Sequence, residues 1–295
     1  MKYTVLPRLG ILLATIIWGT SFIILKDTLD VLPPMFLLTV RFVFAAILIG
    51  LVFFKRMLKI KKKDFLAGIP IGICFFGAYF FQTTGLMYTT PGKNAFLTAV
   101  YCVLVPFIAW AYTRLKPDGF NIAAAVLCIV GIFFVAVEGD FSVGTGDVLT
   151  LIGGVFYAVH IVLIAKFAKD RDPIIITVLQ FAYAAVLCCA VSLCCERIPD
   201  LSSLTAGSYI SVIYLIVCCS ALAMVLQNVG QKYVEPSSAS LILSLEAVFG
   251  VLFSVLAGAE DLTPRIVIGF ILIFIAVIIS ETKLSFITKR LSRRS

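Results

Sequence analysis

The sequence predicts an all-α, polytopic membrane protein whose ten transmembrane helices form two inverted repeats of five. Three observations lead to this fold class: a very apolar composition, ten apolar segments of membrane-spanning length, and a match between the two halves of the chain. Of the 295 residues, 61% are hydrophobic and 14% are charged, and the mean hydropathy is +1.10. Soluble domains carry about 25% charged residues, so lipid is the better solvent for this chain.

Each apolar segment is long enough to form one transmembrane helix, since about 20 helical residues cross the roughly 30 Å of hydrocarbon in a bilayer. The ten predicted spans are 9–29, 34–54, 65–87, 93–113, 119–137, 147–167, 173–194, 207–229, 236–257 and 263–281. Prolines lie at or just before several span starts, where the missing N–H costs little: Pro33, Pro34, Pro91, Pro173, Pro236 and Pro264. The first segment is too long for a secretory signal and no A-x-A-like cleavage site follows it, so we interpret it as a span.

The charges of the loops predict how the spans are oriented. One set of loops, together with both termini, carries 19 of the 24 lysines and arginines, whereas the other loops carry Lys26, Lys93, Arg197 and Arg265. Cytoplasmic loops are rich in basic residues, so we predict a multi-pass protein of the cell membrane with cytoplasmic N- and C-termini. The net charge of +8 is divided among loops and forms no single basic face, which argues against nucleic-acid binding.

Eight of the nine cysteines lie inside predicted spans, Cys195 directly follows one, and no C-x-x-C pair occurs. A thiol in that setting behaves as a small apolar side chain. We therefore predict no disulfide framework, no metal site and no cofactor.

The two halves of the chain match each other through ordered landmarks. At an offset of 139 residues, the matched pairs are Trp18 with Tyr157, Ser21 with His160, Pro34 with Pro173 and Arg41 with Gln180. At an offset of 145 residues, they are Gln82 with Gln227, Gly85 with Gly230, Tyr88 with Tyr233, Pro91 with Pro236 and Tyr101 with Glu246. We predict repeats over 9–138 and 147–281, although their fifth spans match less clearly, and a basic cytoplasmic tail at 282–295.

Five spans per repeat is an odd number, so the second repeat begins on the opposite side of the membrane from the first. Inverted repeats provide a carrier with its outward-open and inward-open states, and the solute binds where the repeats meet. The repeat therefore favours an alternating-access carrier over other classes of membrane protein.

Two charged residues lie deep within predicted spans, away from the span ends, where a charge costs at least about 2.5–3.5 kcal/mol unless it faces a cavity or a partner. Glu246 is about ten residues into the ninth span and Arg41 about seven into the second. In one interpretation Glu246 binds a substrate ammonium or takes up a proton, and Arg41 binds a carboxylate or balances Glu246. In the other, the two form a structural pair or Arg41 snorkels to the membrane surface.

Further amphipathic side chains within the spans complete the candidate binding set, which is Glu246, Arg41, Trp18, Tyr79, Gln82, Tyr101, Tyr157, His160 and Gln180. His160 is the only histidine, and it either lines a cavity or packs with its polar atoms satisfied. Aromatic walls with a few polar groups suit an amphiphilic solute better than a strongly hydrated ion.

The chain resembles the EamA-like branch of the drug/metabolite transporter superfamily over nearly its whole length. The resemblance is carried by Trp18-Gly19-Thr20-Ser21-Phe22, the Pro34 to Arg41 spacing, Gly85 through Ala95, Pro236 to Glu246, and Gly258-Ala259-Glu260 followed by Gly269. It implies a carrier, commonly an exporter, of amino acids, other metabolites or drugs, with a central cavity walled by both halves. The family usually has a proline after the acid of the ninth span, whereas Ala247 follows Glu246 here, which leaves open whether that helix is kinked or broken.

Other functional classes fit the residues less well. An enzyme is not predicted, because the chain has no H-E-x-x-H or G-x-S-x-G motif and a single histidine forms no cluster. A channel or passive facilitator stays an alternative, because inverted repeats occur there too. The predicted partners are a small-molecule substrate, such as an amino acid or amphiphilic metabolite, and the lipid bilayer, with proton coupling and oligomeric state left open.

Overall fold

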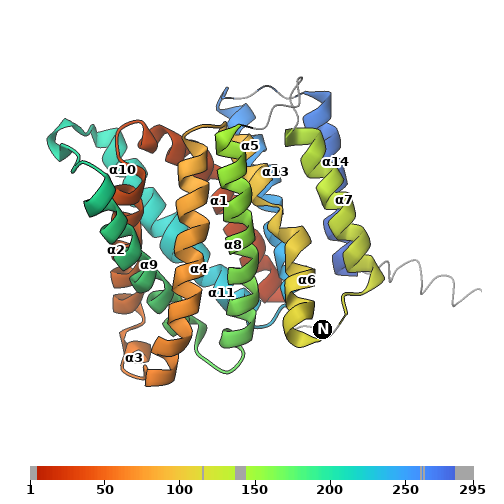
Figure 1. Cartoon of the computed structure of the whole chain (residues 1–295), viewed down its shortest axis with the longest axis horizontal. Coiled ribbons are helices and arrows are strands. Elements are labelled where there is room, and N and C mark those ends of the chain that lie inside the picture. Colours follow the sequence, from red (N-terminus) through yellow and green to blue (C-terminus); the bar gives the residue numbers. More distant parts are fainter. Residues whose placement is uncertain (1–4, 115, 137–143, 260, 262, 283–295) are drawn as a thin grey trace, which may run out of the picture.

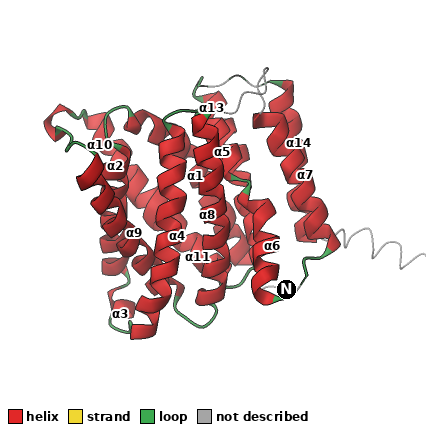
Figure 2. Cartoon of the chain, in the orientation of Figure 1, coloured by secondary structure: helices red, strands yellow, loops and turns green. Residues whose placement is uncertain are grey.

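The structure is a computed structural model that describes residues 5–114, 116–136, 144–259, 261 and 263–282. Within these ranges the chain forms helices and no strand (Figure 2). Eight helical stretches are long and apolar enough to cross a membrane, and two shorter apolar stretches, Gly119–Gly131 and Val267–Ala276, lie in the predicted fifth and tenth spans. The prediction of an all-helical membrane protein is confirmed at this level.

Seven of the predicted spans are single helices. They are α1 (Val5–Leu29), α2 (Pro34–Val52), α4 (Lys62–Leu86), α7 (Gly119–Ala136), α8 (Thr145–Ala168), α9 (Pro173–Cys195) and α14 (Pro264–Thr282). The short helix α3 (Phe54–Met57) follows α2, and a 3-10 turn, η2 (Leu201–Ser203), follows α9. Most of the predicted tail, residues 283–295, and Glu260 lie outside the described residues.

The other three spans are interrupted. The fourth is α5 (Pro91–Thr98) and α6 (Tyr101–Thr113), and the ninth is α12 (Pro236–Leu243) and α13 (Leu245–Leu256). The eighth is α10 (Ala206–Tyr214), the π-helix η3 (Leu215–Leu222) and α11 (Ala223–Gln231). Interruptions of this kind free backbone groups at membrane depth and are common near binding sites.

The ninth span is broken at Ser244, two residues before Glu246, although no proline stands there. The Ser244 hydroxyl donates to the Leu241 carbonyl at 2.8 Å, and the Ala247 amide bonds back only three residues, to the Ser244 carbonyl at 3.1 Å. A serine hydroxyl competes with the helical backbone for such carbonyls. The break therefore places Glu246 in the first turn of a new helix.

Helix starts follow local capping chemistry. Thr90 caps α5 by accepting a hydrogen bond from the Lys93 amide at 3.3 Å, and Asp172 caps α9 by accepting from the Ile174 amide at 2.9 Å. Helix α2 has no cap of its own, so Glu196, at the end of α9, accepts from two of its first amides at 2.8 Å. These caps satisfy amides that the helix itself leaves without acceptors.

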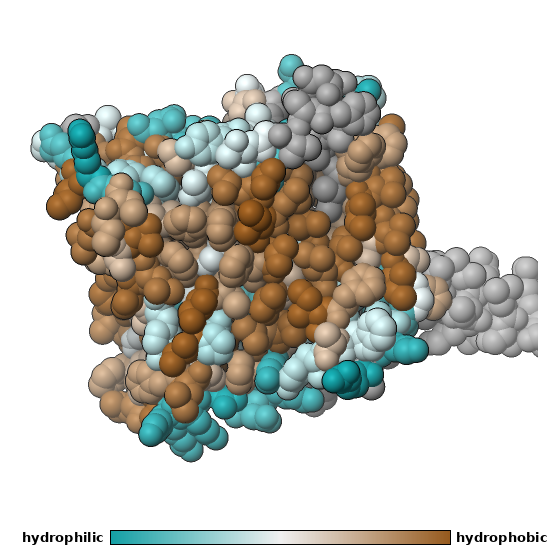
Figure 3. Space-filling model, in the orientation of Figure 1, coloured by the Kyte–Doolittle hydropathy of each residue, from teal (hydrophilic) through white to brown (hydrophobic). Residues whose placement is uncertain are grey.

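The helices pack as one bundle (Figure 1). Helix α4 packs on α8 and α9, α2 packs on α9, and α1 packs on α11 and α13. Helices α7 and α14 pack on each other at one edge of the bundle. Figure 3 shows a largely apolar belt between hydrophilic residues gathered at two opposite ends, as expected for a surface that faces lipid.

Candidate functional site

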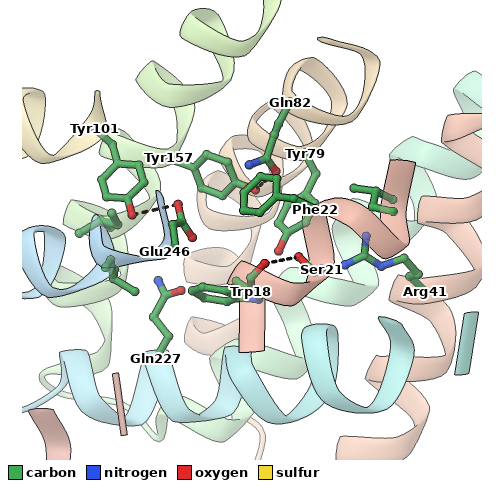
Figure 4. Close-up of a pocket in the computed structure, with 13 residues that line it drawn as sticks. Trp18, Ser21, Phe22, Arg41, Tyr79, Gln82, Tyr101, Tyr157, Gln227 and Glu246 are labelled. Carbon is green, nitrogen blue, oxygen red and sulfur yellow. Dashed lines mark hydrogen bonds between the residues drawn. The ribbon is translucent and has the colours of Figure 1, made fainter. Parts of the chain in front are cut away.

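A small cavity of about 40 Å³ lies at the centre of the bundle. Its walls come from α1, α2, α4, α6, α8, α11, α12 and α13, so helices from both halves of the chain contribute. The lining residues are Trp18, Ser21, Phe22, Leu25, Arg41, Tyr79, Gln82, Tyr101, Tyr157, Ile161, Gln227, Leu243 and Glu246 (Figure 4). The structure thus brings together seven of the nine candidate residues.

Glu246 is buried, and its environment is set by the other half of the chain. The Tyr101 hydroxyl donates to Glu246 Oε1 at 3.0 Å, which joins the two positions that the 145-residue offset matches. In the part of the chain that the structure describes, no lysine or arginine forms an ion pair with Glu246. A buried carboxylate with one hydrogen bond retains acceptor sites for an ammonium group or for a proton.

Arg41 reaches the same cavity from α2 and is only 2% exposed. Its Nε donates to Ser220 Oγ at 3.3 Å, and the Tyr79 ring lies 5.6 Å from its Cζ. Arg41 Nη1 is buried without a hydrogen-bond partner among the described residues. A guanidinium that keeps a free donor next to a cavity is suited to binding a carboxylate.

Neither structural interpretation of Arg41 holds in this structure. Arg41 does not snorkel, because its side chain is buried at the cavity. It does not pair with Glu246 either, because the two side chains stand on opposite sides of the cavity in Figure 4. Aromatic side chains lie between the two charges, which the pairing interpretation did not take into account.

Hydrogen bonds to fixed partners orient the remaining polar walls. Tyr157 donates to Gln82 Oε1 at 2.8 Å, and Gln82 Nε2 donates to Thr98 Oγ1 at 3.0 Å. Trp18 Nε1 donates to the Cys219 carbonyl at 2.7 Å. These partners hold the aromatic rings in place beside the cavity, with Trp18 on one wall and Tyr157 on another (Figure 4).

His160 and Gln180 belong to the candidate set but are not among the residues that line this cavity, so His160 follows the packing interpretation. His160 Nε2 lies 3.1 Å from Gln180 Oε1, and Asn228 donates to the same oxygen at 3.2 Å and to Thr177 Oγ1 at 2.9 Å. Both predicted residues are fully buried. They belong to a polar network between α8, α9 and α11, behind the cavity wall.

Six lining residues lie outside the nine-residue candidate set, namely Ser21, Phe22, Leu25, Ile161, Gln227 and Leu243. The first three follow Trp18 at steps of three, four and seven, so they share its helix face. That spacing could have identified them. Ile161 and Leu243 carry no such signal, because an apolar residue in an apolar helix faces lipid, core or cavity with the same sequence pattern.

In the described ranges, no group of three or more His, Cys, Asp or Glu side chains is placed to hold a metal ion. The chemistry available at the cavity is that of one cation, one carboxylate, hydroxyls, aromatic faces and amides. Such groups bind and orient a solute.

An all-helical bundle with an apolar belt and a buried cavity lined by charged and aromatic groups has the architecture of a membrane transporter. The sequence profile of the EamA-like transporter family matches the chain twice, over residues 7–137 and 144–282. The chain belongs to this family.

Relatives and a solved structure agree with that assignment. An uncharacterized transporter of Archaeoglobus fulgidus is 34% identical over 271 residues, which cover 92% of this chain and 84% of the relative. The Escherichia coli inner membrane transporter YedA is 24% identical, with 96% and 94% covered. A crystal structure of a protein with 16% identity superposes with a TM-score of 0.77 over 97% of this chain and 98% of that one, and it therefore shares the fold.

Proposed function

We propose that this protein is an alternating-access carrier, working as an exporter, for small organic metabolites such as amino acids or amphiphilic drugs. One observation carries the proposal: a buried arginine and a buried glutamate stand on opposite sides of a central cavity with aromatic side chains between them. A solute with a carboxylate at one end and an ammonium at the other would satisfy both charges.

The proposal includes ten spans in two inverted repeats. Residues 91–98 and 236–243 form matching half-helices at the 145-residue offset, and each is followed by a break. Gly85 packs closely against Gly146 and Thr150, and its match Gly230 packs closely against Pro7 and Ile11. Gly146 and Thr150 follow Pro7 and Ile11 by 139 residues, so the two contacts join equivalent positions of the two proposed repeats.

Helix packing supports the same arrangement. If α1, α2, α4 and α7 correspond to α8, α9, α11 and α14, then the contact of α4 with α8 has its counterpart in that of α11 with α1. Two further contacts, α2 with α9 and α7 with α14, join each helix to its own counterpart. Helix α7, with 18 residues, is about 27 Å long, close to the thickness of the hydrocarbon layer.

The proposed topology keeps both termini in the cytoplasm, with repeats over 9–138 and 147–281. It rests on the loop charges described above, of which Lys2 and the basic residues after 282 lie outside the described residues. The described loops alone keep the bias, because Lys55 to Lys63 lie on the proposed cytoplasmic side while Lys26 and Lys93 lie on the other.

The size of the central cavity implies movement during transport. A volume of 40 Å³ has room for about three water molecules, which is less than an amino acid needs. The helices around the cavity must therefore separate for a solute to bind, as alternating access requires.

Flux measurements in proteoliposomes test the proposal. We expect saturable, counterflow-competent uptake of a solute from a panel of labelled amino acids and amphiphilic amines and acids. Losing a charged contact with the solute costs about 1.5–3 kcal/mol, so Glu246→Gln and Arg41→Met should each lower transport at least about tenfold. Asp30→Asn and Arg197→Met, which neutralise exposed charges, serve as matched controls and should transport normally.

The same assay distinguishes the proposal from its alternatives. Ohmic currents without counterflow would favour the channel or facilitator, and conversion of the solute would favour an enzyme. If a pH gradient drives flux in the parent but not in Glu246→Gln, Glu246 takes up a proton. If both proteins ignore the gradient, the proton role is lost and the ammonium role stays.

A further inference from the structure

The bundle has a second and larger cavity, which we call the vestibule. It measures about 390 Å³ and lies between the ends of α6, α8 and α11 and the start of α12. Residues that line it include Ala165, Lys166, Gln231, Lys232, Val234 and Glu235. These helix ends lie at the end of the bundle where the N-terminus is marked in Figure 1, the proposed cytoplasmic end.

The vestibule leads toward the central cavity. On α8, Ile161 lines the central cavity and its neighbour Val162 lines the vestibule. On α11, Gln227 and Gln231 line the two cavities in the same order, and Gln227 Nε2 donates to Gln231 Oε1 at 3.3 Å. Two adjoining helices therefore connect the solute site to the proposed cytoplasmic end.

At the opposite end of the bundle, the corresponding junction lies between α1 and the end of α4, and hydrogen bonds close it. Lys26, near the end of α1, donates from Nζ to the backbone carbonyls of Leu86, Met87 and Thr89 at 2.7, 3.1 and 3.2 Å. Leu86 is the last residue of helix α4, and Met87 and Thr89 directly follow it. The helix dipole favours a cation at this C-terminal end. The single ammonium thus joins α1 to α4 with three charge-assisted hydrogen bonds.

An ion pair also joins two helices at the same end of the bundle. Lys93 at the start of α5 forms an ion pair of 2.8 Å with Asp147 at the start of α8. By the repeat offsets, Lys93 matches Ser238 and Asp147 matches Arg8. Because serine carries no charge, Ser238 and Arg8 form no ion pair with each other.

The repeat offsets show which residue accounts for the difference between the two ends. Lys26 matches Ala165, which lines the vestibule. The matches of the three acceptor residues are Gln231, Lys232 and Val234, which also line the vestibule. The same junction is therefore closed where its helix carries a lysine and open where it carries an alanine. The neighbouring Lys166 does not replace the missing tie, because its Nζ lies over the Tyr112 ring at 4.2 Å.

We propose that Lys26 is the gate residue on the non-cytoplasmic side, and that its release from the end of α4 lets solute leave the central cavity toward that side. This inference rests on the proposed alternating access. In the outward-open state α1 and the end of α4 separate, so the three hydrogen bonds of Lys26 break. Lys26 therefore sets how often the carrier opens outward.

Thiol accessibility in oriented vesicles tests the gate. Ser21 lines the central cavity, and Ser21→Cys is a near-isosteric change that places a thiol there. Its labelling by a membrane-impermeant methanethiosulfonate is measured against the parent with its native cysteines. We expect the added thiol to react faster from the cytoplasmic side. Lys26→Met should raise its reaction from the opposite side about tenfold, the effect expected for losing hydrogen bonds of a charged group.

Two further variants test the direction of the effect. Lys26→Arg keeps a cation that donates to the same carbonyls and should restore slow labelling from outside. Ala165→Lys puts an ammonium beside Gln231, Lys232 and Val234, so it should slow labelling from the cytoplasmic side and speed it from outside. Lys59→Met, an exposed loop lysine, is the control and should change neither rate.

The gate proposal fails if Lys26→Met is as slowly labelled from outside as the parent while the parent shows saturable counterflow. In that case the carrier function survives. If Ser21→Cys reacts equally fast from both sides, the hydrogen bonds of Lys26 do not hold the carrier in its inward-open state, and the gate proposal also fails. A chromatographic check that each variant elutes as the parent does excludes unfolding as the cause of faster labelling.

Discussion

Adding one methyl group at Gly85 or Gly230 tests the mirrored packing of the two halves. A Cβ on Gly85 would lie 2.6 Å from Thr150 Oγ1 and 2.8 Å from the Gly146 carbonyl oxygen. A Cβ on Gly230 would lie 2.5 Å from Ile11 Cγ1 and 2.9 Å from the Pro7 carbonyl oxygen. Because each site includes a backbone atom of the facing helix, side-chain rotation alone does not relieve the overlap.

The expected magnitude follows from this overlap. Overpacking by a methyl group costs about 1–3 kcal/mol, so Gly85→Ala and Gly230→Ala should each lower the free energy of unfolding by about that amount. Such a loss lowers Tm by about 1–2 °C per kcal/mol in a chain of this length. Gly50→Ala is the control, because a Cβ there meets nothing within 4 Å and alanine favours the helix.

Thermal unfolding of the purified protein in one detergent measures all three variants. We expect two similar decreases in Tm and an unchanged or slightly raised value for Gly50→Ala. A decrease for one of the tight glycines alone would contradict the equivalence of the two contacts. No decrease for either would contradict the close helix approach itself.

Three further predictions concern hydrogen bonds to carboxylates. Tyr101→Phe removes the 3.0 Å hydrogen bond to Glu246, worth about 1.5–3 kcal/mol for a charged acceptor, so the initial rate of transport should fall about tenfold or more; a parental rate would remove Tyr101 from the site. Glu196→Gln loses the carboxylate that caps α2 and should lower Tm by an amount corresponding to about 1 kcal/mol, whereas a parental Tm would refute the capping role. Hydrogen bonds from Ser202 lower the pKa of the exposed Asp200, so NMR should show it titrating below the usual aspartate range, and Ser202→Ala should raise that pKa. Because the folded pKa is lowered, the stabilising effect of these bonds is present above the unfolded pKa and is lost as pH falls through the folded pKa.

The helices were predictable because lipid imposes a length and prolines mark the starts. Predicted span 173–194 is α9, Pro173–Cys195, and predicted span 119–137 is α7, Gly119–Ala136. The interruptions were not predictable in the same way. Ser244 breaks its helix without a proline or glycine, and the π-helix Leu215–Leu222 likewise contains neither of these residues. Such breaks depend on which neighbouring helix compensates the freed backbone groups.

The candidate site was partly predictable for a similar reason. Amphipathic residues inside spans must face a cavity or a polar partner, and for Trp18 and Tyr157 the cavity is where they lie. For His160 and Gln180 the same rule is met by polar partners, because the two side chains contact each other and Asn228 on a third helix donates to Gln180. Sequence periodicity identifies the polar face of a helix, but it does not say whether a cavity or a packed polar network covers that face.

In the proposed inverted repeat, the positions that stay alike and the positions that differ have different tasks. Gly85 and Gly230, like Gln82 and Gln227, keep the same residue, which lets the two halves adopt each other's arrangement at similar cost. Tyr101 and Glu246 differ, although they occupy matched positions and touch each other, as they must if both lie close to the pseudo-two-fold axis. Identical residues there would line the cavity with the same group on both sides, whereas the solute proposed for this site has unlike ends. In the proposed carrier, divergence at the cavity therefore provides selectivity for the solute, and divergence at Lys26 and Ala165 sets the balance between the two open states.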